Sequence, residues 1–552
     1  MDLSRRQFAG RALGFAVAAH LPGTVFAQGR PNLSEALSAI RSYGEKHRSY
    51  FNLPGMTLGL ITPDGQQNVL NFGYANADAR TPITSDTMFQ IGSITKAMTA
   101  AVLHQLAAEG RLRLTDRVSR IMPGLSLPAA NSIEVRHLLD HVAGLPTDAP
   151  LFPDGGLWTA YAPGAHWHYS NTGYEILGKL AEHVVQQPLL QLFRDRLFVP
   201  LGMTRSRGAI LGRDRALYAQ GYEAADPIAV YARGAPLRPA PWVDVTAGMG
   251  CVGSTAEDML PFLRALANAA KGNPALGLSG EEARAFASHA VATDTPGMSY
   301  GNGLMHVGNG GRAYLHHTGG MLSFSSSFHV DVASGVGAFA SSTITAFADY
   351  RPRLLTRFAV DALTAALSAH PLPPPPSLQA RLPNAASYVG RYEGPAGAFE
   401  VKPGAPLSIS AGGDEALLEV AGEEVFRTTH PLFRNFSILF ERTRGKVTLA
   451  SFGSNSFLRV DAGAGLPPTD PSLRRLAGRY INDNPWYGGA QVVERGGKLW
   501  LGTETPITSI GENLWRVGRE GWSPERASFA NFIDGRPQTF ILSGEKFLRH
   551  DV

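Results

Sequence analysis

Residues 89–96 read Phe-Gln-Ile-Gly-Ser-Ile-Thr-Lys and lead into the most helical stretch of the sequence. From Ile94 to Ala107 most residues are small or good helix formers, and Gly110 supplies a C-terminal stop. Ser93 therefore lies at a predicted helix start, and Lys96 lies on the same helical face. A serine hydroxyl needs a base before it can act as a nucleophile, and a buried lysine amine can serve as one. The alternative for so short a motif is a helix N-cap beside a solvated lysine.

Two further motifs carry groups of the same chemistry. Tyr169-Ser170-Asn171 precedes a helical segment, and a phenol near an ammonium can pass a proton between a nucleophile and a leaving group. His317-Thr318-Gly319-Gly320 lies on a predicted strand, where glycines let a substrate approach and leave an N–H free for an oxyanion hole. The leading residues Ser93, Tyr169 and His317 are separated by 76 and 148 positions. The three motifs in this order are far more specific than any one of them.

These motifs resemble the serine β-lactamase and penicillin-binding superfamily, in its class C-like esterase and D-aminopeptidase branch. The flanking segments 137–146 and 163–164 are also similar, and the similarity covers about residues 31–368. The resemblance implies that Ser93 is the nucleophile and that Lys96 and Tyr169 share the general-base role. It further implies an oxyanion hole made by the backbone N–H groups of Ser93 and Gly320. Substrate contacts are implied for Asn171, His317, Thr318 and Gly319.

His317 is a departure, because it stands where β-lactamases hold a lysine. A histidine is mostly neutral near pH 7 and grips a substrate carboxylate less firmly than a lysine does. The resemblance therefore favours a D-aminopeptidase-like peptidase that acts on a small molecule or short peptide. A carboxylesterase and a non-catalytic penicillin-binding or sensing protein are the alternatives. The mechanism implied here needs no metal and no cofactor.

The order of the predicted elements indicates an α+β fold for residues 31–370. Strands are expected near both ends of this region, with helices and Gly/Pro-rich loops between them. Such an order predicts an antiparallel sheet that both ends of the segment complete, decorated by a helical region. The expected strands are 56–61, 69–74, 313–317, 325–330 and 336–341, and the expected terminal helices are 33–47 and 354–368.

A proline-rich linker, residues 371–383, separates this region from a tail of short alternating segments typical of antiparallel β structure. Gly390-Arg391-Tyr392 recurs as residues 478–480, and Phe457-Leu458-Arg459 recurs as residues 547–549. The offsets are 88 and 90 residues. Two recurrences in the same order predict a tandem pair of β-barrels, residues 384–468 and 469–552.

The charge of the chain argues against nucleic-acid binding. The formal net charge is only +4, and no run of Lys or Arg is present that could track a phosphate backbone, so we expect no nucleic-acid partner.

Residues 1–27 resemble a twin-arginine export signal, with Arg5 and Arg6 before a weakly apolar stretch and Val25-Phe26-Ala27 as a cleavage site. Cys251 is the only cysteine, so an intramolecular disulfide is excluded. We expect a periplasmic or secreted protein whose mature chain has no membrane span; the sequence does not indicate an oligomeric state.

Two other motifs could suggest different chemistry. Residues 297–301 satisfy the G-x-S-x-G pattern of α/β-hydrolases, but Thr295-Pro296 precedes them, so we interpret them as a turn that leads into a strand. His137 and His141 are four residues apart, a spacing that could present two metal ligands from a helix. No third ligand is apparent nearby, which favours a structural role for this pair.

Overall fold

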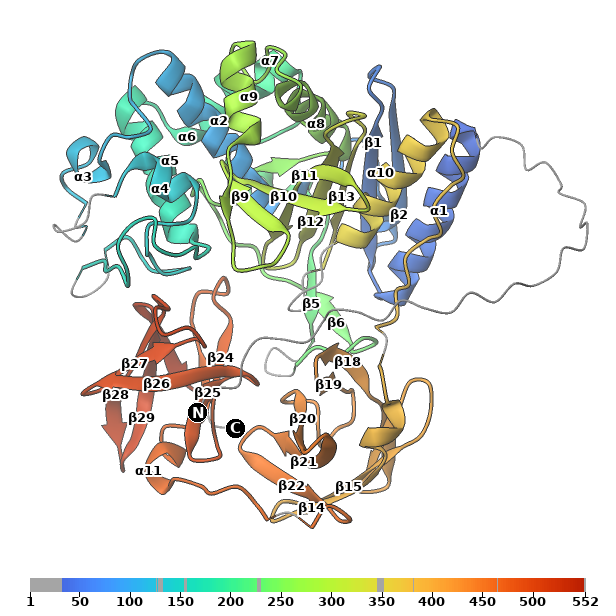
Figure 1. Cartoon of the computed structure of the whole chain (residues 1–552), viewed down its shortest axis with the longest axis vertical. Helices are drawn as coiled ribbons and strands as arrows, with labels where there is room; N and C mark the ends of the chain where they lie inside the picture. The colour runs from blue at the N-terminus through green and yellow to red at the C-terminus, as the bar shows by residue number, and fades with distance from the viewer. Residues whose placement is uncertain are drawn as a thin grey trace, which may run out of the picture.

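The computed structural model describes residues 32–550 except 126, 128–132, 153–155, 226–229, 345–351, 381 and 464. The predicted export signal, residues 1–27, lies outside the described residues. An α+β domain is followed by two barrel-like antiparallel sheets (Figure 1). This architecture confirms the predicted fold class. Within the described residues, no helix is both long and apolar enough to cross a bilayer.

A nine-stranded antiparallel sheet forms the centre of the first domain. Strands from the two ends of this domain meet in its middle, because β1 pairs with β13. The expected joining of both ends of the segment in one sheet is therefore confirmed. In spatial order the strands are β3 (Thr81–Pro82), β2 (Gln67–Asn76), β1 (Gly55–Ile61), β13 (Gly337–Ser342), β12 (Ser325–Asp331), β11 (Arg312–Gly320), β10 (Leu304–Asn309), β9 (Met298–Gly301) and β8 (Val291–Ala292).

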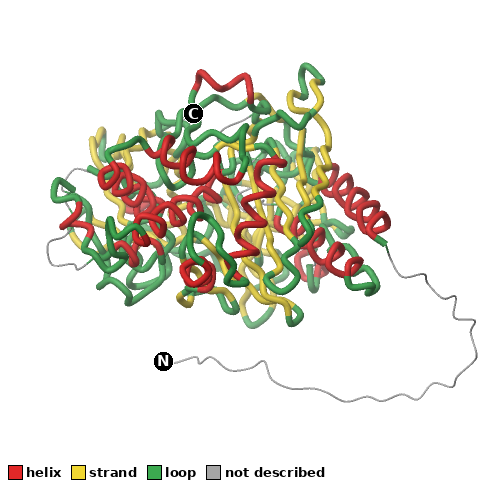
Figure 2. Tube along the Cα trace, turned by 90° about the horizontal axis from the view of Figure 1, so that it is seen from above, coloured by secondary structure: helices red, strands yellow, loops and turns green. Residues whose placement is uncertain are grey.

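Helices cover both faces of this sheet, and Figure 2 shows them on either side of the strands. α1 (Leu33–Tyr50) begins with a capping box between Asn32 and Glu35 and packs with α10 (Arg353–Leu367) on one face. The helices on the other face and in the region beside it are α2 (Thr95–Ala108), α3 (Val118–Ile121), α4 (Val135–Leu139), α5 (Asn171–Val185), α6 (Leu189–Phe193), α7 (Val199–Leu201), α8 (Ala256–Ala270) and α9 (Gly280–Ser288). Shorter elements are β4 (Phe89–Gln90), β5 (Tyr222–Ala224), β6 (Leu237–Pro239), β7 (Gly253–Ser254), and the helical turns η1 (Gly92–Ile94), η2 (Arg194–Phe198) and η3 (Gly212–Leu217).

Alternation along β1 and β13 divides the core into two parts. Met56, Leu58 and Leu60 share a core with α1 and α10, because side chains two apart on a strand point to one face. Gly59 faces the opposite way, where a Cβ atom would meet Leu260 of α8 at 3.0 Å. The absence of a side chain at Gly59 thus lets α8 pack closely on the sheet.

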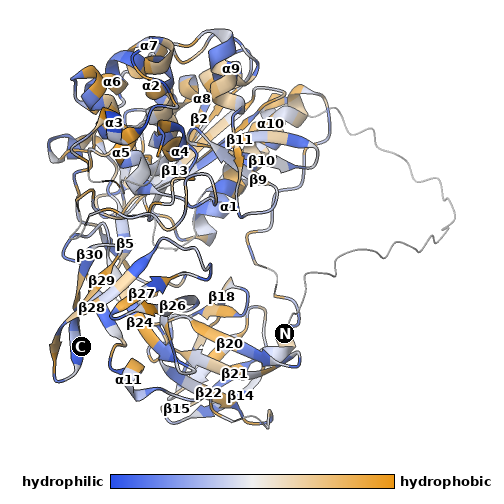
Figure 3. Ribbon diagram, turned by 60° about the vertical axis from the view of Figure 1, so that its left-hand side comes forward, coloured by the Kyte–Doolittle hydropathy of each residue, from blue (hydrophilic) through white to orange (hydrophobic). Residues whose placement is uncertain are grey.

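The tail forms two antiparallel sheets whose strands carry hydrophobic stretches (Figure 3). The first sheet is nearly closed and opens between β17 and β18, whereas the second is a closed barrel. The first contains β14 (Gly390–Gly394), β15 (Gly397–Lys402), β16 (Ser408–Ala411), β17 (Asp414–Leu417), β18 (Glu419–Gly422), β19 (Val425–Arg427), β20 (Ile438–Thr443), β21 (Lys446–Phe452) and β22 (Asn455–Arg459), after the turn η4 (Ala385–Tyr388). The second follows α11 (Pro471–Arg474) and contains β23 (Gly478–Ile481), β24 (Gly489–Arg495), β25 (Lys498–Leu501), β26 (Thr505–Gly511), β27 (Leu514–Val517), β28 (Arg526–Ile533), β29 (Arg536–Leu542) and β30 (Glu545–Arg549).

The repeated tripeptides lie where each of these sheets joins its first strand to its last. Tyr392 of β14 pairs with Arg459 of β22, and Tyr480 of β23 pairs with Arg549 of β30. Each tyrosine hydroxyl donates to a carbonyl four residues earlier, at 2.7 Å in both cases. The repetition in the sequence therefore marks the same pairing of first and last strands in two related units.

Candidate active site

A tight turn presents Ser93 at the start of α2. Ser93 lies within η1 and is partly exposed, whereas Gly92 and Ile94 on either side are buried. The turn is anchored because Ile91 N–H donates to the carbonyl of Val252 at 3.1 Å. Gly92 has a φ of +57°, which favours glycine, and a Cβ atom there would come within 2.8 Å of the Gly320 backbone. The serine thus projects from a rigid turn that lies directly against the end of β11.

Lys96 is completely buried one turn further along. Its Nζ atom lies 3.0 Å from Ser93 Oγ, 2.7 Å from Asn171 Oδ1 and 2.9 Å from the carbonyl oxygen of Met249. Burial lowers the pKa of Lys96 to about 7, against the opposing effect of the nearby Asp148 carboxylate. A large fraction of the lysine is therefore neutral near pH 7, and the neutral amine can accept the Ser93 proton.

The helix N-terminus that follows Tyr169 fixes the second motif. Ser170 caps α5, because its hydroxyl accepts a hydrogen bond from Gly173 N–H at 3.0 Å and donates one to the carbonyl of Pro146 at 2.7 Å. The face of the Tyr169 ring lies 4.9 Å from Lys96 Nζ, close enough for a cation–π contact when the amine is charged. Asn171, the first residue of α5, bonds directly to that amine.

The end of β11 forms the opposite wall. Gly319 lies against Ile91, where a Cβ atom would come within 1.9 Å of the Ile91 carbonyl oxygen. This approach, with that of Gly320 to Gly92, brings the backbone of the His-Thr-Gly-Gly segment to the turn that carries Ser93. Thr318 precedes these glycines and is partly exposed. The Gly320 backbone nitrogen therefore lies beside the serine turn, and an oxyanion hole made by the N–H groups of Gly320 and Ser93 stays a prediction.

His317 is buried and bonded on both ring nitrogens. Nδ1 lies 2.6 Å from the carbonyl oxygen of Thr318, and Nε2 lies 3.2 Å from the hydroxyl of Tyr300. Burial, with a smaller contribution from the positive charge of Lys96, lowers the pKa of His317 to about 3. The imidazole is thus neutral at physiological pH and supplies no fixed positive charge for a substrate carboxylate. Its ring centre lies 6.4 Å from that of Tyr169, so the three predicted motifs meet at one place.

Sequence reasoning missed several residues that complete this site. His141 accepts a hydrogen bond from Ser170 N–H at 3.1 Å, and its ring lies 4.3 Å from that of Tyr169. Asp148 accepts one from Asn171 Nδ2 at 2.9 Å. The sequence placed His141 in the similar segment 137–146 and favoured a structural role for it and His137, without indicating its contact with the Tyr169 segment. His137 accepts from Glu134 N–H within α4's N-terminal turn. The positions of His141 and Asp148 in the sequence did not indicate these contacts with residues 169–171.

The G-x-S-x-G pattern belongs to an ordinary strand. Residues 298–301 form β9, and Ser299 pairs with His306 of β10, which confirms the predicted turn and strand. Tyr300 of this strand reaches the site, because its hydroxyl lies 3.2 Å from His317 Nε2.

The comparisons with known proteins agree with this geometry. A family model described as Beta-lactamase matches residues 45–361, more than half of the chain. The chain belongs to the beta-lactamase family. A beta-lactamase of Pseudomonas fluorescens is 32% identical over 200 residues, which cover 34% of this chain and 53% of that protein. Penicillin-binding protein 4* of Bacillus subtilis is 28% identical over 255 residues, or 41% of this chain and 54% of its own length. The chain spans about half the length of these relatives.

Solved structures show the same fold. The octameric penicillin-binding protein homologue from Pyrococcus abyssi has a TM-score of 0.54 at 23% identity and covers 77% of this chain and 100% of its own. A D-amino acid amidase from Ochrobactrum anthropi has a TM-score of 0.50 at 24% identity and covers 60% of this chain and 99% of its own. The recognition of the serine β-lactamase and penicillin-binding superfamily from three short motifs is thus confirmed.

The second barrel of this beta-lactamase-family chain docks beside the Tyr-x-Asn segment. Glu525, between β27 and β28, accepts hydrogen bonds from Thr147 N–H at 2.6 Å and from His168 Nε2 at 3.0 Å. Burial alone would raise the pKa of Glu525, but the bonds from His168, Ser543 and Thr147 hold it below its ordinary value. The ring of Trp522 stacks on His166 at 4.4 Å. A charged carboxylate from the barrel therefore holds the loop that carries Tyr169.

We expect Glu525→Gln to lower kcat by about tenfold to a hundredfold, because small shifts of a catalytic group are costly. The amide is uncharged, so its bonds with Thr147 N–H and His168 are weaker, and its nitrogen cannot accept from Ser543 as the second carboxylate oxygen does, which reduces the support of Tyr169. Glu520→Gln changes an exposed residue of the same loop and is the matched control. Equal kcat for the two variants, measured by steady-state hydrolysis of an activated ester, would show that the docking has no catalytic role.

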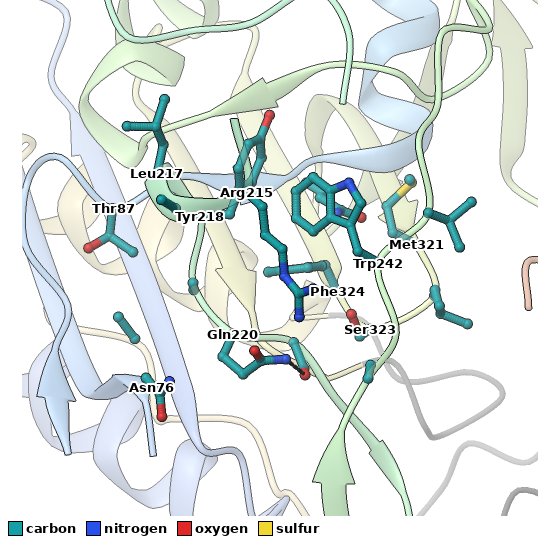
Figure 4. Close-up of a pocket in the computed structure, with 18 of the residues that line it drawn as sticks. Asn76, Thr87, Arg215, Leu217, Tyr218, Gln220, Trp242, Met321, Ser323 and Phe324 are labelled. Atoms are coloured by element: carbon teal, nitrogen blue, oxygen red, sulfur yellow. Dashed lines mark hydrogen bonds between the residues drawn. The ribbon is translucent and has the colours of Figure 1, made fainter. Parts of the chain in front are cut away.

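A large pocket begins where β11 ends (Figure 4). Its volume is about 750 Å³, and Met321 and Ser323, which follow Gly320, line it together with Gln90, which precedes the serine turn. Trp242 and Tyr218 pack edge to face at 5.1 Å on its wall. Trp486 of the second barrel also lines it, so two domains shape this space.

The depressed pKa of Lys96 predicts the pH dependence of acylation. The base is active when deprotonated, so kcat/KM is expected to fall about tenfold per pH unit below pH 7 and to level off above it. The measurement is kcat/KM for an activated ester between pH 5 and pH 9. A profile that is flat from pH 5 to pH 8 would mean that Lys96 does not act as the base.

Proposed function

We propose that this protein is an exported serine hydrolase that cleaves the amide bond of D-aminoacyl peptides or amides through an acyl-enzyme on Ser93. The observation that carries the proposal is the buried amine of Lys96, 3.0 Å from Ser93 Oγ and with a pKa of about 7. In the proposed mechanism, Ser93 Oγ gives its proton to Lys96 and attacks the substrate carbonyl. The N–H groups of Ser93 and Gly320 stabilise the oxyanion.

Tyr169 has the second proton-transfer role in this proposal. The C–N bond of the tetrahedral intermediate breaks as the leaving nitrogen receives a proton, which passes from Lys96 through the Tyr169 phenol. A water molecule then attacks the acyl carbon, returns its proton to the same pair of residues and releases the acid. The position of the Tyr169 ring, 4.9 Å from Lys96 Nζ, supports this role.

The charges around the serine support an amine-bearing substrate. His317 is neutral, so it offers no positive charge to a carboxylate. Asp148 is a half-buried carboxylate on the other side of Asn171, and burial raises its pKa while the bond from Asn171 opposes that shift. When Lys96 is neutral, an ionised Asp148 gives this part of the site a negative charge. Such a charge attracts the free ammonium group of an aminoacyl substrate.

A substrate panel tests this proposal. We expect D-alanyl and D-phenylalanyl p-nitroanilides to be hydrolysed with a higher kcat/KM than p-nitroanilides that are N-acetylated. Asp148→Asn is expected to raise KM about tenfold or more for the free amines, because a hydrogen bond to a charged group contributes about 1.5–3 kcal/mol. The same variant is expected to change p-nitrophenyl butyrate hydrolysis far less, because the effect of Asp148 on Lys96 and Asn171 is common to both substrates and only the free amines carry an ammonium group to pair with the carboxylate. Rapid ester hydrolysis with no turnover of any aminoacyl amide would instead support a carboxylesterase.

A further inference from the structure

A groove lies between the two barrel-like sheets of the tail, and both sheets contribute residues to it. These residues are far from Ser93 in the sequence. The volume of the groove is about 730 Å³. The first barrel contributes Phe436 and the turn at Ser454-Asn455, and the second contributes residues from α11, β23, β24 and the end of β30. Gln491 Nε2 donates to the carbonyl of Asn435 at 2.8 Å, which holds the barrels together here. In Figure 3, α11 lies between the strands of the two barrels.

Arginines dominate the lining of this groove. No aspartate or glutamate is among the described residues that line it. Arg475 and Arg536 are exposed, and Arg474 is partly neutralised by Glu494, 3.5 Å away. Arg549 is held by backbone carbonyls, such as that of Pro537 at 2.7 Å. The cationic side chains are Arg474, Arg475, Arg479, Arg536 and Arg549, with His550 beside them.

Five guanidinium groups in one groove repel one another, and an anion would relieve this repulsion. We propose that the groove binds the phosphate groups of a linear phosphate or phosphodiester polymer. Guanidinium groups form paired hydrogen bonds with phosphate oxygens, and a phosphate can accept from more than one arginine at once.

The groove is poorly suited to nucleic acid. Single strands bind by stacking their bases on aromatic rings. Phe436 is the aromatic ring among the described lining residues, and Arg479 already covers it, with its Cζ atom 5.5 Å from the ring centre. The other ring in the lining is the His550 imidazole, so the groove offers much charge and little free stacking surface. These arginines come from separate segments, so the lack of a basic run in the sequence could not reveal them. The absence of a nucleic-acid partner stays a prediction.

Binding of labelled polyphosphate to the full chain tests this proposal. Arg475→Glu with Arg536→Glu is the test variant, and Arg444→Glu with Arg519→Glu, which changes two exposed barrel arginines outside the groove, is the control of equal charge. We expect the test variant to weaken binding about tenfold or more in 50 mM salt and the control to change it less than about threefold. Hydrolysis of an activated ester should be unchanged in both, which shows correct folding and separates this inference from the proposed reaction.

Other outcomes would overturn the proposal. Equal losses in the test and control variants would mean that net charge alone drives binding. Equal or tighter binding of poly-glutamate would remove the preference for phosphate. Tighter binding of single-stranded DNA than of polyphosphate, lost in the test variant, would make the groove a nucleic-acid site instead.

Discussion

Replacing Lys96 with methionine is expected to lower kcat/KM for any acylating substrate by about 10³-fold or more, because general-base help of this kind contributes about 10²–10⁴-fold. Methionine keeps much of the apolar volume of the lysine side chain but cannot accept the Ser93 proton. It also leaves Asn171 Oδ1 and the Met249 carbonyl without their donor. The measurement is steady-state hydrolysis of a p-nitrophenyl ester at pH 8.

Lys179→Met provides the control for this variant. Lys179 is an exposed lysine on α5 that pairs with Glu182 at 3.0 Å, so the same replacement there leaves the site untouched. Its kcat/KM should remain within about twofold of the original, because exposed pairs contribute little. A Lys96→Met enzyme as fast as the control would mean that another group activates the serine.

Gly319→Ala is expected to reduce kcat by about 10²–10³-fold, the loss typical of a missing oxyanion-hole donor. The added Cβ atom would fall 1.9 Å from the Ile91 carbonyl oxygen, a backbone atom that cannot move aside alone. The end of β11 must therefore shift away from the serine turn, which takes the Gly320 N–H with it. KM is expected to change less than kcat, because the contact is made mainly in the transition state.

Gly308→Ala is the matched control, because Gly308 lies in the neighbouring strand β10. A Cβ atom there would meet only the Arg312 carbonyl oxygen, at 3.8 Å, which is an ordinary contact. That variant should keep full activity. If Gly319→Ala is equally active, the close approach of β11 to η1 has no catalytic importance.

Much of the fold follows from local signals in the sequence. The helical run from Ile94 to Ala107 became α2, Thr95–Ala108, since its small residues suit a buried helix. The recurrence of two tripeptides located both barrel-like sheets, because each tripeptide lies at a strand that closes its unit. The opening between β17 and β18 of the first sheet had no counterpart in these patterns, because strand pairing at that point depends on tertiary geometry.

The catalytic motifs were recognisable, whereas their supporting residues were not. Ser93, Lys96 and Tyr169 belong to short sequence motifs, and the order of these motifs along the chain is specific to the superfamily. Asp148 and Glu525 act through contacts with residues 23 and 357 positions away, and nothing local distinguishes them from other acidic residues. Long-range contacts of this kind are created only when the domains fold and dock.

Intact-protein mass spectrometry after reaction with a fluorophosphonate tests the central claim, that Lys96 activates Ser93, most directly. We expect the protein without substitutions to gain one phosphonyl group rapidly, and fragmentation of the labelled protein should place this group on Ser93. The Ser93→Ala variant should gain none, and Lys96→Met should react slower by about 10²-fold or more. A single adduct that forms at the same rate in all three proteins would contradict the account.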